Sequence, residues 1–271
     1  FNKLLFAAHR CLQWFLLHVV SSPVVASDMV TRAQRQYFNP DVLFQFRDIE
    51  KPVQSHLKNV YSLLSVGLIV ATIGATLYTL SPAVQSWAFS LMLLSTVTSI
   101  GSLMHIYMTE HSRENLQNRI ISFLLFTFST GLGLGPLVHF ASNFNPSTIP
   151  AAFLGTALIF VSFTIASLIT RKRYFIYLGG ILSTTLGVML TFGLMNIFLR
   201  SEALFHVELY LGFAVFCLFI VYDTQMIVFK RQNGEDDFVK HAIDLFVDVV
   251  EVFRHLLIIL NSKRERNERR E

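Results

Sequence analysis

Two carboxylates stand out because they occur inside apolar stretches long enough to lie in a membrane. Asp223 lies in VYDTQMI, directly after the apolar run LYLGFAVFCLFI, and Asp248 follows LFV in the segment 238–260. A charge at the centre of a membrane helix costs about 2.5–3.5 kcal/mol even on insertion scales. The connection KRQNGEDD predicts a hairpin that brings both carboxyls to a similar depth. Two carboxyls in a low-dielectric site do not both ionise easily, so we expect this pair to share a proton and respond to pH.

The same pair also suits weak cation binding. Calcium prefers about six to eight oxygen ligands, so two carboxylates alone would hold it only transiently. A conducting site requires such weak binding, because tight binding would block passage. We therefore predict that Asp223 and Asp248 form the pH sensor and transient calcium site of an ion pathway. Three further side chains on the same predicted helix face are secondary candidates for lining it: Asp244, Glu251 and His255.

The composition indicates a membrane protein. Of the 271 residues, 53% are hydrophobic and 15% charged, whereas soluble domains carry about 25% charged residues. The mean hydropathy is +0.52. Six apolar runs approach or exceed the roughly 20 residues that a spanning helix needs: 57–80, 84–108, 120–142, 149–170, 174–199 and 207–229. We predict an all-α polytopic membrane protein, a seven-transmembrane-helix bundle with six clear spans and an amphipathic seventh.

The seventh segment, 238–260, differs from the others because charged side chains follow one side of the predicted helix. Most of them fall within an arc of about 100°. The stripe contains acids as well as bases, which favours a helix facing the interior of a bundle over an interfacial anchor. A complete span and a re-entrant segment both fit the sequence. A purely structural alternative also fits, in which Asp223 pairs with Arg254 or Lys240 and holds two helices together.

Small residues predict where helices approach closely. STGLGLGP (129–136) and LGGILSTTLG (178–187) supply glycine, serine and threonine for packing in lipid. The glycine run lies inside an apolar span rather than between a strand and a helix, so it does not indicate phosphate binding. Pro136 is expected to kink or end its helix.

Basic residues occur before the first predicted span and then in every second connection between spans. This distribution predicts a cytoplasmic N-terminus. The basic tail 263–271 suits anionic lipid or a protein partner, and the chain shows no nucleic-acid surface. Two cysteines, Cys11 and Cys217, indicate neither a disulfide nor a metal centre. No cofactor is expected beyond calcium and protons as transported or regulatory ions. The predicted orientation in the membrane depends on these basic residues: Lys51, Lys58, Arg113, Arg119, Arg171, Lys172, Arg173, Lys230 and Arg231.

Several segments together resemble the Bax inhibitor 1 family, the transmembrane Bax-inhibitor-motif proteins. The most specific is VYDTQMIVFKRQNGEDDFVKHAIDLFVDVVEVFRHLLIIL (221–260). HLKNVY (56–61), TGLGLGPLVHF (130–140), NPSTIPAAFLGTALIF (145–160) and YLGGIL (177–182) follow the family order. The resemblance divides the chain into an extension at 1–37 outside it, a membrane domain at 38–262 and the basic tail.

The resemblance implies a seven-helix fold and, in eukaryotes, residence in the endoplasmic reticulum membrane. It further implies a pH-sensitive calcium leak that lowers store calcium, and suppression of stress-induced apoptosis through Bcl-2-family partners. The paired aspartates of the family's last two helices correspond to Asp223 and Asp248. Bacterial relatives carry a basic cluster at the end of the second helix that can pair with these aspartates. Here that region reads HIYMTEHSR, with His105 and His111 and no arginine before Arg113.

Three other classes of protein compete with this prediction. Intramembrane aspartyl proteases also place a YD dipeptide in one helix and an aspartate in the next. The second aspartate here lacks the GxGD setting and no PAL turn follows it, so we predict that the protein is not an enzyme. A proton-coupled cation transporter would use the same carboxylates, although no internal repeat is evident. A non-conducting anti-apoptotic interaction protein would act through its tail and loops.

Overall fold

The computed structural model describes residues 51–169 and 178–268, with side chains described up to Lys263, and these residues are almost entirely helical. The extension at 1–37 and the basic residues at 171–173 lie outside the described ranges. The helices are α3 (Lys51–Leu80), α4 (Pro82–Ser86), α5 (Ala88–Met108), α6 (Leu116–Phe144), α7 (Thr148–Ile169), α8 (Leu178–Leu199), α9 (Glu202–Gln232) and α10 (Phe238–Glu268). The predicted all-α fold is confirmed.

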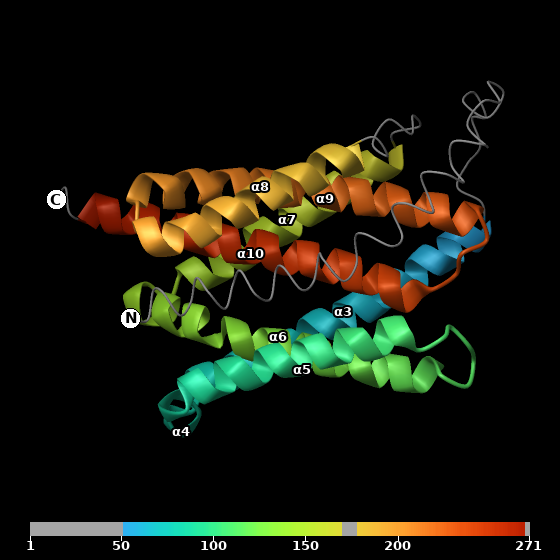
Figure 1. The fold of residues 1–271 in the computed structure, drawn as a ribbon, viewed down its shortest axis with the longest axis horizontal. Helices are drawn as coiled ribbons and strands as arrows, with labels where there is room; N and C mark the ends of the chain where they lie inside the picture. The colour runs from blue at the N-terminus through green and yellow to red at the C-terminus, as the bar shows by residue number, and fades with distance from the viewer. Residues whose placement is uncertain (1–50, 170–177, 269–271) are drawn as a thin grey trace.

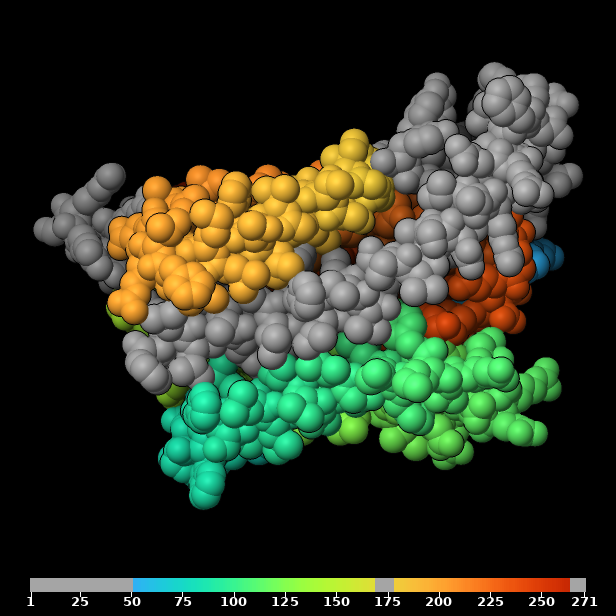
Figure 2. Space-filling model, viewed as in Figure 1, coloured from blue at the N-terminus to red at the C-terminus, as the bar shows by residue number. Residues whose placement is uncertain are grey.

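Six of these helices are long and apolar enough to cross a membrane, as predicted: α3, α5, α6, α7, α8 and α9. In the space-filling view, α5 and α8 form two broad outer surfaces (Figure 2). Both helices expose large apolar side chains, among them Leu94 and Val97 on α5 and Ile181 and Val188 on α8. Extended apolar surfaces of this kind suit contact with lipid tails.

The most polar of the long helices, α10, lies at the centre. It runs between a group formed by α3, α5 and α6 and a group formed by α7, α8 and α9 (Figure 1), and it packs against α3, α6, α7 and α9. Every side chain from Leu245 to Val252 is buried. A helix buried on all sides belongs to the core, so the predicted interior position is confirmed. With 31 residues in one uninterrupted helix, α10 is about 46 Å long and does not turn back.

The predicted second run, 84–108, is not a single helix. Ser81 caps α4 by accepting from the Val84 N–H, and Pro82 starts that helix. At Trp87 the backbone leaves the helical region, with φ −100° and ψ 18°. The chain resumes as α5 when the Leu91 N–H donates to the Trp87 carbonyl at 2.9 Å. The cap and the proline thus set a short separate helix before the span.

Pro136 does not end its helix, since α6 continues to Phe144. A proline removes one helical hydrogen bond, and packed neighbours can hold the rest of the helix in place. Glycines on both helices allow α6 to pack closely against α3. A Cβ added at Gly131 would lie 2.0 Å from the Ala71 carbonyl oxygen, and one at Gly74 would lie 2.6 Å from the Phe128 carbonyl oxygen. The packing role predicted for this glycine run is therefore confirmed between α3 and α6.

Candidate functional site

The hairpin between α9 and α10 brings the two predicted aspartates together. At the turn, Asn233 N–H donates to the Phe229 carbonyl at 3.1 Å, and Gly234 adopts φ +93°, which favours glycine. Past this turn, α10 runs back along α9. The carboxyl groups of Asp223 on α9 and Asp248 on α10 come within hydrogen-bonding reach of each other. A hydrogen bond between them needs a proton on one of the two carboxyls.

Asp248 is the more deeply buried of the pair, with 2% exposure, whereas Asp223 is partly buried. The second oxygen of Asp248, Oδ2, is buried and has no hydrogen-bond partner among the described residues. Asp244, one turn closer to the hairpin, lies within electrostatic range of both aspartates. The predicted pair and the first secondary candidate thus form one group of three carboxyls between α9 and α10.

A contact with α7 holds the Asp223 region of α9. Ser167 Oγ donates to the Val221 carbonyl at 3.0 Å. The Gln225 side-chain amide donates in return to the Ser167 carbonyl. These two hydrogen bonds lie on either side of Asp223 along α9, so they fix the helix at the position of the carboxylate.

The remaining secondary candidates form an ion-paired group further along α10. Arg254 Nη2 lies 2.5 Å from Glu251 Oε2. His255 Nδ1 donates to the Glu251 carbonyl at 2.8 Å and lies 3.7 Å from Glu251 Oε2. Lys240 in turn lies 3.4 Å from Asp237. The structural alternative, in which Arg254 or Lys240 pairs with Asp223, is therefore wrong. Arg254 pairs with Glu251 and Lys240 pairs with Asp237.

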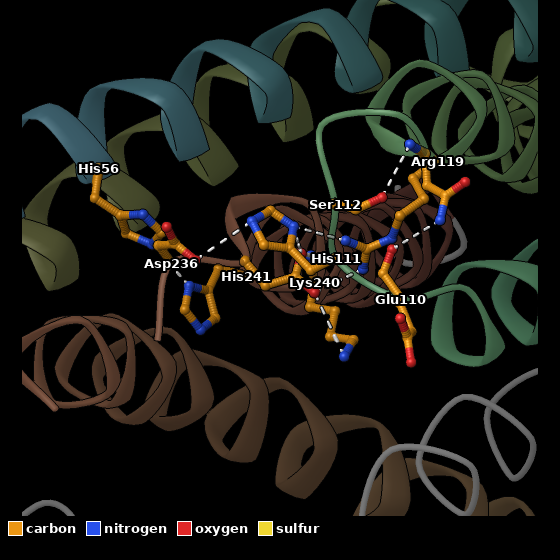
Figure 3. A network of polar contacts seen from close by, with 10 residues as sticks. His56, Glu110, His111, Ser112, Arg119, Asp236, Lys240 and His241 are labelled. Carbon is orange, nitrogen blue, oxygen red and sulfur yellow. Dashed lines mark hydrogen bonds and ion pairs between the residues drawn. The ribbon is translucent and has the colours of Figure 1, made fainter. Parts of the chain in front are cut away.

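A second polar network joins the hairpin to the start of α6, and the sequence did not predict it (Figure 3). We call its four members, Arg119, His111, Asp237 and Lys240, the hairpin clamp. Arg119 is fully buried, and its Nη2 donates to Asp237 Oδ2 at 2.6 Å. Arg119 Nη1 also donates to His111 Nδ1 at 2.9 Å. The sequence places Arg119 among the loop cations that predict topology, but it lies inside α6 and is fully buried.

The geometry of the clamp assigns the protons on its members. Arginine only donates, so His111 Nδ1 accepts and the ring carries its proton on Nε2, which faces Asp236 Oδ1 at 3.3 Å. Asp237 also caps α10 by accepting from the Lys240 N–H. Burial alone would raise the pKa of Asp237, but the hydrogen bond and charge of Arg119, with help from Lys240, bring it below 3.8. Asp237 is therefore a carboxylate at neutral pH.

A histidine pair joins α3 to α10 near the clamp. His56 Nε2 and His241 Nδ1 lie 2.9 Å apart, and both rings are buried. The rings meet edge-on, with an interplanar angle of 82°. Only one of the two facing nitrogens can carry a proton, so the pair is a single hydrogen bond. Within residues 51–169 and 178–268, no group of three or more His, Cys, Asp or Glu side chains is placed to hold a metal ion.

The comparisons with known proteins agree with this architecture. A family model described as "Inhibitor of apoptosis-promoting Bax1" matches residues 53–265. The chain is 40% identical over 222 residues to "Bax inhibitor 1" of Bos taurus, which covers 82% of this chain and 92% of the relative. The protein of the same name from Homo sapiens is 39% identical over 234 residues, covering 86% and 97%. The one from Arabidopsis thaliana is 36% identical over 221 residues, covering 81% and 86%. This membrane protein therefore belongs to the Bax inhibitor 1 family.

Proposed function

We propose that the protein is a pH-sensitive calcium leak of the endoplasmic reticulum membrane that lowers store calcium and suppresses stress-induced apoptosis. The observation that supports the proposal best is the close approach of the Asp223 and Asp248 carboxyls between α9 and α10. Asp248 is buried on α10, the helix that packs against α3, α6, α7 and α9, in a structure with six membrane-length apolar helices. The names of the relatives support the anti-apoptotic part.

In this mechanism the acid pair is both sensor and ion site. With one proton between them, Asp223 and Asp248 hold α9 against α10. Loss of that proton replaces the hydrogen bond with repulsion between two carboxylates. The same change presents several carboxylate oxygens, which are the ligands that calcium prefers. Asp244 lies within electrostatic range of the pair. Two carboxylates alone hold calcium only weakly, as passage of the ion requires.

The decisive experiment measures calcium efflux from liposomes that contain the purified full-length protein. Asp223→Asn and Asp248→Asn each remove a titrating carboxyl while keeping its size. We expect both variants to lower the efflux about tenfold or more and to flatten its dependence on pH, because neither retains a shared proton. Glu110→Gln, an exposed carboxyl in the α5–α6 loop, is the matched control and keeps the wild-type profile. Unchanged efflux and pH dependence in both aspartate variants would refute the mechanism.

The same vesicles separate a leak from a proton-coupled transporter. A leak follows the calcium gradient whatever the proton gradient, whereas a transporter moves calcium uphill when a proton gradient is imposed. In cells, removal of residues 263–271 tests the non-conducting alternative. Loss of protection from stress-induced death with intact calcium efflux would assign the function to Bcl-2-type partners of the tail instead.

A further inference from the structure

A small cavity lies between α6 and α10, from the level of Asp248 to the second turn of α10 beyond it. Its volume is about 20 Å³, and a site of about 10–15 Å³ is enough for one water molecule. On α6 it is bordered by Phe126, Thr130 and Leu134. On α10 its lining begins at Phe246 and Val247 and ends at Glu251 and Arg254.

Arg254 brings an incompletely satisfied charged group to this cavity. Its side chain is 8% exposed and Glu251 is 5% exposed, and the two form the 2.5 Å ion pair. Arg254 Nε is buried and has no hydrogen-bond partner among the described residues. Buried N–H groups without a protein acceptor are usually satisfied by ordered water. The size of the cavity and the free N–H together indicate a water site beside the ion pair.

This ion pair lies next to the acid pair along α10. Glu251 and Arg254 are about 4.5 Å and 9 Å beyond Asp248 along the helix axis. Glu251 lies within electrostatic range of Asp248. A cation that leaves the aspartates in this direction therefore meets a fixed guanidinium whose charge is offset by one carboxylate. In a low-dielectric interior, such a charge strongly affects the passage of an ion.

We propose that Arg254 is the electrostatic barrier of the pathway, facing the water site, and that Glu251 sets the height of this barrier by partly neutralising it. The inference rests on the proposed function, since it concerns the rate at which cations pass the acid pair. It goes beyond a structural ion pair because it assigns opposite effects to the two partners. Arg254 slows cations and Glu251 assists them.

Calcium efflux from the same liposomes provides the test. Arg254→Gln removes the barrier charge and is expected to raise efflux about tenfold, whereas Glu251→Gln unmasks the guanidinium and is expected to lower it about tenfold. Arg254→Lys keeps the charge on a more compact cation and is expected to raise efflux less than Arg254→Gln does. The double variant Glu251→Gln with Arg254→Gln restores charge balance, and its two amides can hydrogen-bond, so it serves if a single variant folds poorly. Lys263→Gln, an exposed cation on the same helix, is the matched control.

The outcomes distinguish the two proposals. If Arg254→Gln and Glu251→Gln shift efflux in the same direction, or the double variant does not return toward wild type, the pair is structural and the inference is wrong. If Asp223→Asn and Asp248→Asn leave efflux and its pH dependence unchanged, the proposed function fails instead. Opposite shifts in the Arg254 and Glu251 variants, together with loss of efflux in the aspartate variants, support both proposals.

Discussion

Arg119 on α6 and Asp237 in the α9–α10 hairpin form a buried ion pair, with Nη2 and Oδ2 2.6 Å apart. The residues are separated by 118 positions in sequence. Their contact fastens the hairpin that carries both Asp223 and Asp248 to the first turn of another helix. The geometry of the acid pair is therefore linked to a group of charges at one end of the bundle.

Removing the charge of Asp237 should destabilise the protein strongly. Asp237→Asn keeps the size of the side chain but leaves the Arg119 guanidinium buried without a counter-ion. Loss of one partner of a buried pair typically costs about 3–5 kcal/mol. Denaturant unfolding in detergent micelles measures this loss. Asp236→Asn changes the neighbouring carboxylate, whose side chain is 60% exposed, and should cost at most about 1 kcal/mol. Equal losses in the two variants would contradict the assignment.

The contribution of Asp237 should depend on pH only under acidic conditions. Its pKa in the folded protein lies below 3.8, so its stabilising effect is fully present above the unfolded-state pKa. The effect is lost as the pH falls through the lower folded-state pKa. The difference in melting temperature between wild type and Asp237→Asn is therefore expected to be constant from about pH 5 to pH 8 and to shrink below about pH 4. A difference that changes around neutral pH would show that another group titrates with the clamp.

The approach of α3 to α6 should tolerate no side chain at Gly131. Gly131→Ala places a Cβ against the Ala71 carbonyl, so the helix backbones have to separate. We expect a loss of about 1–3 kcal/mol or more, measured by thermal unfolding. Gly101→Ala on α5 adds the same methyl group where nothing lies within 4 Å. That substitution should be neutral or stabilising by up to about 1 kcal/mol. A neutral Gly131→Ala variant would mean that the helices are further apart.

The histidine pair should stabilise the contact between α3 and α10. His56→Phe keeps a ring but removes the nitrogen that faces His241, leaving a buried polar atom without its partner. The expected cost is about 1–3 kcal/mol, again read from denaturant unfolding. His105→Phe, at an exposed position on α5, is the control. It removes only a solvent-exposed contact with Ser122 Oγ and should cost less than His56→Phe does. A His56→Phe variant as stable as wild type would rule out a stabilising hydrogen bond.

Most of the architecture follows from local sequence properties, while the clamp does not. Apolar length predicts the six spans, and the mixture of acids and bases on 238–260 predicts that α10 lies inside the bundle. The short connection KRQNGEDD predicts a hairpin. Because the two flanking helices then run back along each other, Asp223 is expected to lie near Asp248. Arg119 and Asp237 have no such signal. Each looks like an ordinary loop charge, and only the packing of α6 beside the hairpin makes them partners.

The helix break at Trp87 and the unbroken helix through Pro136 are also features that local sequence properties do not predict. Both positions lie in apolar sequence where hydropathy is uniform. The side-chain cap at Ser81 starts a short helix that ends at the Trp87 break. At Pro136, the packing of α6 against α3 outweighs the usual tendency of proline to end a helix. Hydropathy reports where a helix can lie, whereas caps and neighbouring backbones determine where it ends.

The central position of α10 has a consequence for biogenesis. Six helices are apolar enough to enter the bilayer one at a time as they are synthesised. The last helix carries Asp244, Asp248, Glu251 and Arg254 and would be poorly soluble in lipid alone. Its integration therefore depends on the bundle made before it, whose interior supplies the partners that lipid lacks. Nascent chains that stop before residue 238 would lack the helix against which α3, α6, α7 and α9 pack.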